Sequence, residues 1–572
     1  MNVKTASSIM ADVLNETYTY LGAGHKDSGL EIIRNKLLSL SGLETFDFDL
    51  LKGKNYSYED IQEVLSTLKE KESIRRSKGV YYTPADVVRF IIGNSVRSAY
   101  GKLGTKGFQT AEPSGIPYRS FCMTKSVFDP TCGAGEFLLA ALETKFDLLD
   151  DHVKNVTGEM ISNIVSTVYG NDIDKESTAI YKIRLFLCAV RRYGLRRCSS
   201  IDKILNRNFY NKDFISDISE PGRRFDIIIG NPPYVEDGKS GLSLTKKYGN
   251  IYANVLDNSA RLLNDNGSIG FVIPLSYVST PRMKAIRKEL FLNIPEQYIF
   301  SYSDRPDCLF KSVHQKLCIL IGKKRKGGKR IFTGNYQYWY KEERESLFEQ
   351  TSAVKNDFAA EDYIPKLGTP ADVEVYKKVR PAGERIKLTE LSGIGEESVY
   401  VNMRAAFWIK AFRQEHTGSE YKRFTFRNAG AADYFSCIVN SSLFWWYWIC
   451  VSDYWHITNK ELHGFTVPQL SDFSTASRLA AALENRLEET KLYVGTKQTE
   501  YEYKHRCCVD EIHAIDDFVN GLYGLTEEES GYIKSFAHRY RVSGGAELTL
   551  FLKAGSESRK VQTAVSAERK KL

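Results

Sequence analysis

Apolar runs of strand length alternate with amphipathic, helix-like segments from about residue 79 to residue 322. In chain order the runs are SVFDP, STVYGNDID, FDIIIGNPPY, GSIGFVIP and KLCILIG. This alternation is typical of a parallel β-sheet whose crossover helices cover both faces. We therefore predict an α/β fold with a Rossmann-like, doubly wound sheet, in which ligands bind at the carboxyl ends of the strands.

The pattern changes on both sides of this segment. Before it, a helical N-terminal region is predicted. Its apolar residues recur at helical spacing, at Ile61, Val64, Leu65 and Leu68. After it, the basic stretch KKRKGGKR, residues 323–330, interrupts the periodicity and predicts a domain boundary. The predicted parts are residues 1–75, 76–325, 326–475, 476–554 and 555–572, of which the fourth is helical and the last a flexible polar tail.

Composition narrows the class of protein only slightly. The chain has 572 residues and a net charge of +8, which suits a polyanionic partner but also an ordinary globular protein. Its ten cysteines form no CxxC pair, so we expect no metal site, no disulfide framework and a reducing, cytoplasmic compartment. The longest apolar run, around Leu443–Val451, is too short to span a bilayer, so no membrane partner is expected.

The segment FDIIIGNPPY carries the most specific chemistry. Two prolines remove backbone donors and fix φ, so the strand must stop at Asn231, Pro232 and Pro233 and leave their carbonyls facing a cleft. The Asn231 side-chain oxygen and the Pro232 carbonyl could accept both N–H bonds of an exocyclic amine and direct its lone pair at a methyl donor. Tyr234 would stack on the ring that carries the amine. A base inside a duplex would have to flip out to reach this position.

A glycine-bearing turn follows the first strand, in VFDPTCGAGEFLLAAL. Gly133 and Gly135 would let the backbone approach a ligand closely, and Asp129 offers a carboxylate. The turn departs from GxGxxG, which favours a cofactor without a pyrophosphate over a dinucleotide.

The next two strand ends also carry candidate cofactor ligands. NDID offers Asp172 for the ribose hydroxyls of an adenosine cofactor, with Asp174 as the alternative, and Ile173 between them is counted with the same site. NKDF offers Asp213 as an acceptor for the cofactor's adenine amine and Phe214 as a packing surface for that ring.

Taken together, these segments resemble the gamma class of N6-adenine DNA methyltransferases, the Taq-like group. KGVYYTPADVVRFI, residues 78–91, is similar to the N-terminal cofactor motif of that family, so the resemblance places Thr83 and Tyr81 beside the methionine end of S-adenosylmethionine. It identifies FDPTCGAG as the glycine loop, NDID as the ribose acid, KDF as the adenine contact and NPPY as the catalytic loop. A later family motif places an aromatic residue on the far face of the flipped base, for which Phe310 is the candidate. The resemblance covers about residues 75–325.

The resemblance also implies a mixed α/β target-recognition domain at residues 326–475. SSLFWWYWICVSDYWHITNKELHGFTVP resembles the end of such domains, although its aromatic residues could equally form a core cluster. Recognition of bases needs side chains such as arginine and lysine, each of which could instead be a surface charge. The candidates are Arg404, Lys410, Arg413, Lys422, Arg423 and Arg427.

The sequence therefore predicts a site-specific methyltransferase that acts on adenine N6 in double-stranded DNA, as a monomer, with or without a cognate restriction or defence partner. An RNA base or a protein glutamine amide is the alternative substrate, and a non-catalytic DNA-binding module is a third hypothesis. No nuclease activity is predicted, because the helical N-terminal region lacks a convincing strand-borne cluster of carboxylates and lysine. The interval from Asp129 to Asp172 exceeds a simple strand–helix–strand unit, so residues 145–166 are expected to form an insertion or an extra helix.

Overall fold

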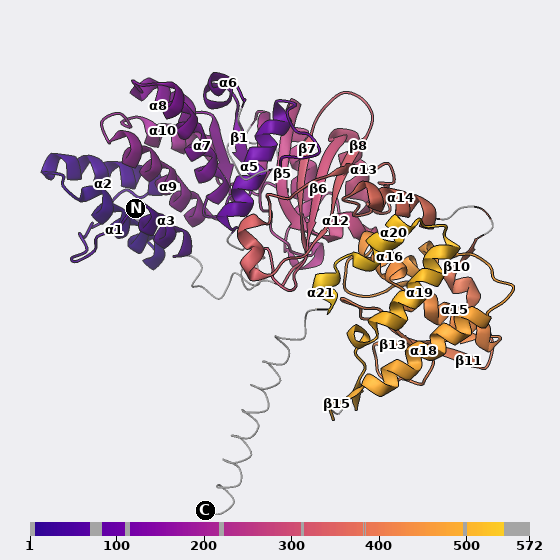
Figure 1. Ribbon diagram of the computed structural model, residues 1–572. Helices are drawn as coiled ribbons and strands as arrows, with labels where there is room; N and C mark the ends of the chain where they lie inside the picture. Colours follow the sequence, from indigo (N-terminus) through magenta and orange to yellow (C-terminus); the bar gives the residue numbers. More distant parts are fainter. Residues whose placement is uncertain are drawn as a thin grey trace, which may run out of the picture. The chain divides into compact units, whose positions relative to one another are not determined.

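The computed structural model describes residues 6–68, 83–108, 115–216, 222–310, 314–380, 383, 385–495 and 500–542. The chain divides into two compact units, Met1–Gly368 and Thr369–Leu572. Each unit contains its own sheet and helices (Figure 1).

A nine-stranded sheet forms the centre of the first unit, in the order β3-β2-β1-β4-β5-β7-β6-β8-β9. The strands are β1 (Val127–Asp129), β2 (Val168–Asn171), β3 (Phe209–Tyr210), β4 (Phe225–Gly230), β5 (Leu263–Pro274), β6 (Glu296–Tyr302), β7 (Leu317–Lys323), β8 (Arg330–Gln337) and β9 (Val354–Lys355). Strands β1 to β5 pair in parallel. The predicted α/β class with a mostly parallel sheet is confirmed.

Helices pack against this sheet, and the N-terminal helices lie beside it (Figure 1). They are α1 (Ser8–Gly22), α2 (Asp27–Ser41), α3 (Tyr58–Thr67), α5 (Ala85–Ala99), α6 (Tyr118–Met123), α7 (Glu136–His152), α8 (Gly158–Val165), α9 (Lys175–Tyr193), α10 (Ile201–Asn208), α11 (Ile251–Leu262), α12 (Ser276–Ser279) and α13 (Lys284–Asn293). The helical N-terminal region is confirmed by α1, α2 and α3, which pack on α9. Helix α8 is the extra helix expected between Asp129 and Asp172.

The approach of α5 to the sheet depends on one glycine. A Cβ atom at Gly270 of β5 would lie 2.1 Å from the Ser95 hydroxyl oxygen of α5. Both faces of the second half of β5 are buried, and α11 also packs against this strand. Burial on both faces explains why β5 reads as a nearly continuous apolar run.

Two predictions about this sheet are wrong. KLCILIG forms β7, which is antiparallel to both β5 and β6, because β6 and β7 form a hairpin. A buried strand has the same apolar composition in either direction, so its orientation could not be read from the pattern. KKRKGGKR is not a domain boundary: it spans the end of β7 and the connection to β8, and β8 pairs in parallel with β6. The division falls instead after Gly368.

The second unit combines short strands with helices, in agreement with a mixed α/β composition. Its helices are α14 (Pro370–Val379), α15 (Ala429–Asn440), α16 (Ser442–Val451), α17 (Asn459–Gly464), α18 (Ser474–Thr490), α19 (Val509–Leu522), α20 (Glu527–Ser535) and α21 (His538–Val542). Its strands are β10 (Ile386–Lys387), β11 (Glu397–Asn402), β12 (Lys410–Phe412), β13 (Tyr421–Phe426), β14 (Thr466–Val467), β15 (Leu492–Tyr493) and β16 (Tyr501–Glu502). Strands β12, β11 and β13 form an antiparallel sheet.

The aromatic run SLFWWYWICV forms α16, and every residue of this helix is buried. It is therefore a core helix of the second unit, which agrees with the interpretation of this aromatic run as a core cluster. Within the described ranges, no helix combines the length and the apolar character that crossing a bilayer requires.

Candidate active site

The carboxyl ends of β1, β2 and β4 meet at one edge of the sheet of the first unit. These three strands are adjacent and parallel, with β1 between β2 and β4. The glycine turn follows β1, the acidic NDID segment ends β2, and NPPY follows β4. The structure thus brings together three segments that the sequence singled out separately.

The Asn231 side chain is bound at both ends. Its Nδ2 donates a hydrogen bond to the Thr83 hydroxyl oxygen at 3.1 Å. The Tyr234 hydroxyl lies 2.5 Å from Asn231 Oδ1 and 2.8 Å from the Val272 carbonyl oxygen, both of which are acceptors. The amide oxygen that was predicted to accept an amine therefore faces the Tyr234 hydroxyl.

The two predicted base-stacking rings differ in burial: Tyr234 is half-buried and Phe310 is buried. The Tyr234 ring packs against the hydrophobic core, with Tyr252 edge-on at a centroid distance of 6.4 Å. Phe310 is 1 % exposed and lies in the same core. Stacking on a base would require Phe310 to become exposed, and the stacking roles of both rings stay predictions. Tyr81 lies outside the described residues.

Asp129, predicted to offer a carboxylate at this turn, lies beneath the glycines and is 1 % exposed, so its role as a cofactor ligand stays a prediction. Its Oδ1 accepts a hydrogen bond from the Thr131 amide at 3.0 Å. A Cβ atom at Gly230 would lie 2.7 Å from the same oxygen, so β4 needs glycine immediately before Asn231. Burial raises the pKa of the Asp129 carboxyl well above its usual value, and the charge of Asp172 raises it further.

The two predicted glycines have different surroundings. Gly133 has φ +53°, its amide donates to Asp172 Oδ2 at 2.8 Å, and a Cβ atom there would meet nothing within 4 Å. Gly135 has φ +90°, and a Cβ atom there would lie 2.5 Å from Tyr181 Cβ. Gly133 therefore leaves open space beside the turn, whereas Gly135 allows the turn to pack against α9.

Geometry separates the two candidate ribose acids. Asp174 is the N-cap of α9 and accepts hydrogen bonds from the amides of Glu176 and Ser177. Asp172 Oδ2 accepts a hydrogen bond from the Gly133 amide and its Oδ1 accepts one from the Asp174 amide, and the neighbouring Ile173 side chain is 61 % exposed. Asp172 and Ile173 therefore lie at the glycine turn, whereas Asp174 lies at the start of the helix.

In the NKDF segment, Asp213 makes hydrogen bonds within its own loop. Asp213 Oδ1 accepts from the Ile215 amide at 3.0 Å, and Oδ2 accepts from the Ser216 hydroxyl at 2.6 Å. Phe214 is 4 % exposed, with its ring 5.8 Å from that of Phe128 in β1. Phe214 is therefore part of the support of β1, and its contact with a cofactor ring stays a prediction.

Arg184 of α9 is a site residue that the sequence analysis missed. It is 3 % exposed and donates to the Ala134 carbonyl oxygen at 2.6 Å, to Glu136 and to Gln62 of α3. It thereby ties the glycine turn to the helical N-terminal region. An arginine inside the otherwise apolar stretch IRLFLCAV was the signal that could have revealed it.

The six basic candidates in the second unit fall into two groups. Lys410 and Arg413 make contacts within the unit: Lys410 Nζ donates to the Tyr503 carbonyl oxygen, and Arg413 pairs with Glu397 and Asp433 at 2.5 and 2.9 Å. The side chains of the other four are exposed, namely those of Arg404, Lys422, Arg423 and Arg427.

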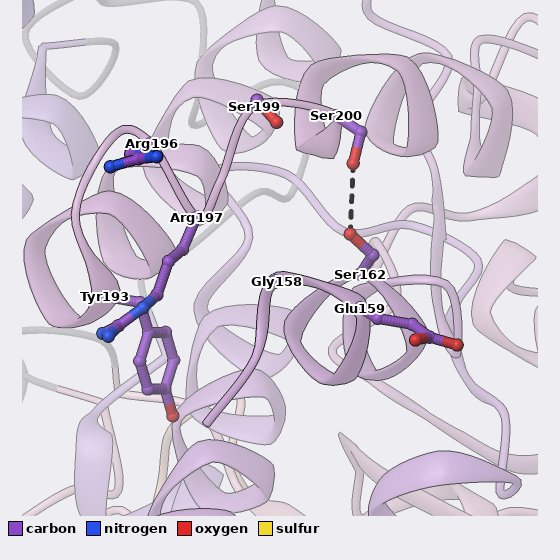
Figure 2. Close-up of a pocket in the computed structure, with 8 residues that line it drawn as sticks. All are labelled: Gly158, Glu159, Ser162, Tyr193, Arg196, Arg197, Ser199 and Ser200. Carbon is purple, nitrogen blue, oxygen red and sulfur yellow. Dashed lines mark hydrogen bonds between the residues drawn. The ribbon is translucent and has the colours of Figure 1, made fainter. Parts of the chain in front are cut away.

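A surface pocket of about 760 Å³ is lined by residues of the first unit (Figure 2). Tyr193, the last residue of α9, lines it, and Figure 2 shows Ser162 and Ser200 joined by a hydrogen bond. Because α9 has 19 residues and starts beside Asp172, its two ends are about 28 Å apart. The pocket is therefore separate from the Asn231 site.

Comparison with known proteins shows a match between the central segment and one family model. Residues 166–305 match the model of the Eco57I restriction-modification methylase. The Type II methyltransferase M.VspI of Vibrio sp. (strain 343) is 24% identical over 267 residues, 44% of this chain and 50% of that protein. The Type II methyltransferase M.BstVI of Geobacillus stearothermophilus is 26% identical over 186 residues, 30% of this chain and 32% of that protein. The chain thus matches half or less of the length of these two relatives.

A solved structure extends the likeness to nearly the whole chain. The Type IIL restriction-modification enzyme MmeI, solved in complex with DNA, superposes with a TM-score of 0.51 at 11% identity and covers 93% of this chain and 100% of that one. At this identity the likeness concerns the fold alone. Residues 166–305 are therefore similar to the Eco57I restriction-modification methylase model, and the chain shares its fold with the MmeI structure.

Proposed function

We propose that this protein is a site-specific DNA methyltransferase that transfers the methyl group of S-adenosylmethionine to N6 of a flipped adenine in double-stranded DNA. The observation that carries the proposal is the Asn231 amide, which follows a buried strand with its oxygen oriented by hydrogen bonds, beside a glycine turn and an acidic strand end. The names of the relatives, Type II methyltransferases, support DNA modification within a restriction-modification setting.

The residues at the glycine turn fit the proposed cofactor. S-adenosylmethionine supplies an electrophilic methyl group when it is bound. Gly133 leaves space for a ligand, and the buried Thr131 hydroxyl has no hydrogen-bond partner among the described residues. Asp172 offers carboxylate oxygens for ribose hydroxyls, and the exposed Ile173 side chain offers an apolar surface for an adenine ring.

Asn231 would raise the reactivity of the target amine. The lone pair of an exocyclic amine is delocalised into its ring, and acceptors at both N–H bonds favour a pyramidal nitrogen. Asn231 Oδ1 and the Pro232 carbonyl are the proposed acceptors. The Tyr234 hydroxyl has a second acceptor in the Val272 carbonyl at 2.8 Å, so it can release Asn231 Oδ1 without losing its hydrogen bond.

We propose direct transfer without a covalent enzyme intermediate. Cys132 is the thiol nearest to the glycine turn, and burial raises its pKa well above its usual value. A neutral thiol is a weak nucleophile, so this residue is a packing group in the proposed mechanism.

Transfer of tritium from labelled S-adenosylmethionine tests the proposal. The purified protein is offered duplex DNA, RNA and protein, and the labelled product is hydrolysed to identify the modified base. We expect label at adenine N6 in DNA only, with the target site found by methylation-sensitive sequencing. Asn231→Ala should lower the rate at least about 100-fold, because it removes a positioned acceptor, while cofactor affinity changes little. Label on RNA or protein alone would refute the DNA assignment.

A further inference from the structure

Thr83 is buried against the catalytic loop. It is 4 % exposed and lies two residues before α5, the helix that packs on β4 and β5. The first turn of α5 is fixed by a two-point ion pair between Asp86 and Arg344, at 2.6 and 2.9 Å. The Thr83 hydroxyl is therefore a fixed point next to Asn231.

A fixed point matters because the terminal torsion of an asparagine side chain has only broad energy minima. The amide has a donor end and an acceptor end, and only the acceptor end can receive an amine N–H. Rotation by half a turn would present Nδ2 to the target amine, donor against donor.

The structure places the nitrogen end of the Asn231 amide at Thr83 and its oxygen end at Tyr234. The 3.1 Å separation between Asn231 Nδ2 and Thr83 Oγ1 is typical of an N–H···O bond. The 2.5 Å separation between the Tyr234 hydroxyl and Asn231 Oδ1 is typical of an O–H···O bond. Thr83 thus holds the nitrogen end, which leaves the oxygen end for the Tyr234 hydroxyl or for a substrate.

We infer that Thr83 is a positioning residue for Asn231, and that it acts by anchoring the amide nitrogen so that Oδ1 faces the target amine. The inference rests on the proposed function. It gives Thr83 a different role from the cofactor contact that the family resemblance implies. Thr83 acts on the transfer step through Asn231 and leaves cofactor affinity unchanged.

The test compares Thr83→Val, which keeps the side-chain shape but removes the acceptor, with Thr83→Ser, which keeps the acceptor. Cofactor affinity is measured by calorimetry with S-adenosylmethionine alone, and the transfer rate in single turnovers at saturating cofactor and substrate. Thr83→Val should slow transfer about 10- to 100-fold, because a misplaced catalytic group costs up to about 100-fold. Its cofactor dissociation constant should stay within twofold of the wild-type value, and Thr83→Ser should restore the rate to within threefold.

Thr144→Val is the matched control, because the Thr144 hydroxyl donates to the Ala140 carbonyl within α7 and plays no part in the site. Thermal unfolding of each variant reports on folding. A weaker cofactor affinity with an unchanged rate at saturation would make Thr83 a cofactor ligand and overturn the inference. An unchanged rate and affinity in Thr83→Val would overturn it as well. The assay uses the substrate that accepts label from the wild-type protein. Label on RNA or protein would refute only the assignment of DNA as the substrate. No label on any substrate would refute both the proposed function and the role of Thr83.

Discussion

Two side chains of the protein itself engage both ends of the Asn231 amide. The Tyr234 hydroxyl occupies the acceptor that the proposed mechanism reserves for the target amine. Since a buried acceptor without a partner is costly, the phenol keeps Asn231 Oδ1 satisfied until a base arrives. In the proposed mechanism Tyr234 has two separable features, a hydroxyl that gives way to the target amine and a ring that stacks on the base.

Substitution of Tyr234 separates these features. Tyr234→Phe should keep kcat/KM for DNA within about tenfold of the wild-type value, because the ring remains and the lost hydrogen bond is not part of the substrate complex. Tyr234→Ala should lower kcat/KM about 10- to 100-fold, because stacking on a base contributes about 1–3 kcal/mol. Steady-state methylation of a defined duplex measures both. If the phenylalanine variant is as impaired as the alanine variant, the hydroxyl is the essential group.

Several residues of the candidate site could be named from the sequence. Some of their roles follow from local sequence signals, whereas others depend on contacts between distant residues. Asn231 stood out because two prolines must end a strand there. Asp172 and Asp174 have the same chemistry two positions apart, and only the N-cap of α9 distinguishes them. The hydrogen bond from Asn231 to Thr83 joins residues 148 positions apart, so no local pattern could show it.

At the scale of the element, the turn between β1 and α7 contains two glycines with different surroundings. Gly135 packs against Tyr181, whereas Gly133 faces open space. The motif FDPTCGAG made both glycines candidates for the same role, close approach to a ligand. Packing against α9, which the motif does not contain, assigns them different roles.

Alanine substitutions should distinguish the two glycines. Gly135→Ala should lower the free energy of unfolding by about 2–5 kcal/mol, since it adds a backbone cost at positive φ to a clash with Tyr181. Gly133→Ala should cost only about 1–2 kcal/mol, but its methyl group enters the proposed ligand space and should weaken cofactor binding at least tenfold. Denaturant unfolding and calorimetry with S-adenosylmethionine measure these effects. Equal stability losses in the two variants would contradict the assignment.

At the scale of the whole molecule, the basic residues that give the net charge of +8 differ in their surroundings: some are paired within the protein and others are exposed. Arg413 is committed to Glu397 and Asp433, and Lys410 to a backbone carbonyl. Arg404 and Arg427 are exposed and are available to phosphates. Net charge therefore overstates the number of cations that can meet DNA in the proposed complex.

The salt dependence of DNA binding should reveal this division. Exchanging Arg404 or Arg427 for glutamine should reduce the slope of log K against log salt by about one for each phosphate contact that is lost. Arg413→Gln should instead lower stability and leave the slope unchanged, because its guanidinium is already paired. Fluorescence anisotropy with a labelled duplex from 50 to 200 mM salt, roughly, covers the informative range. If the slope of log K against log salt decreased only in Arg413→Gln, the distinction between paired and exposed arginines would be contradicted.

The sequence by itself determined the α/β class, the order of the strand ends and the residues that terminate them. These properties follow from hydrophobic periodicity and from proline and glycine, which act locally. Only the tertiary structure decided the direction of β7, the division after Gly368 and the contact between Thr83 and Asn231. Each of these depends on which distant segments pack together, and buried strands or hydroxyls carry no local mark of their partners.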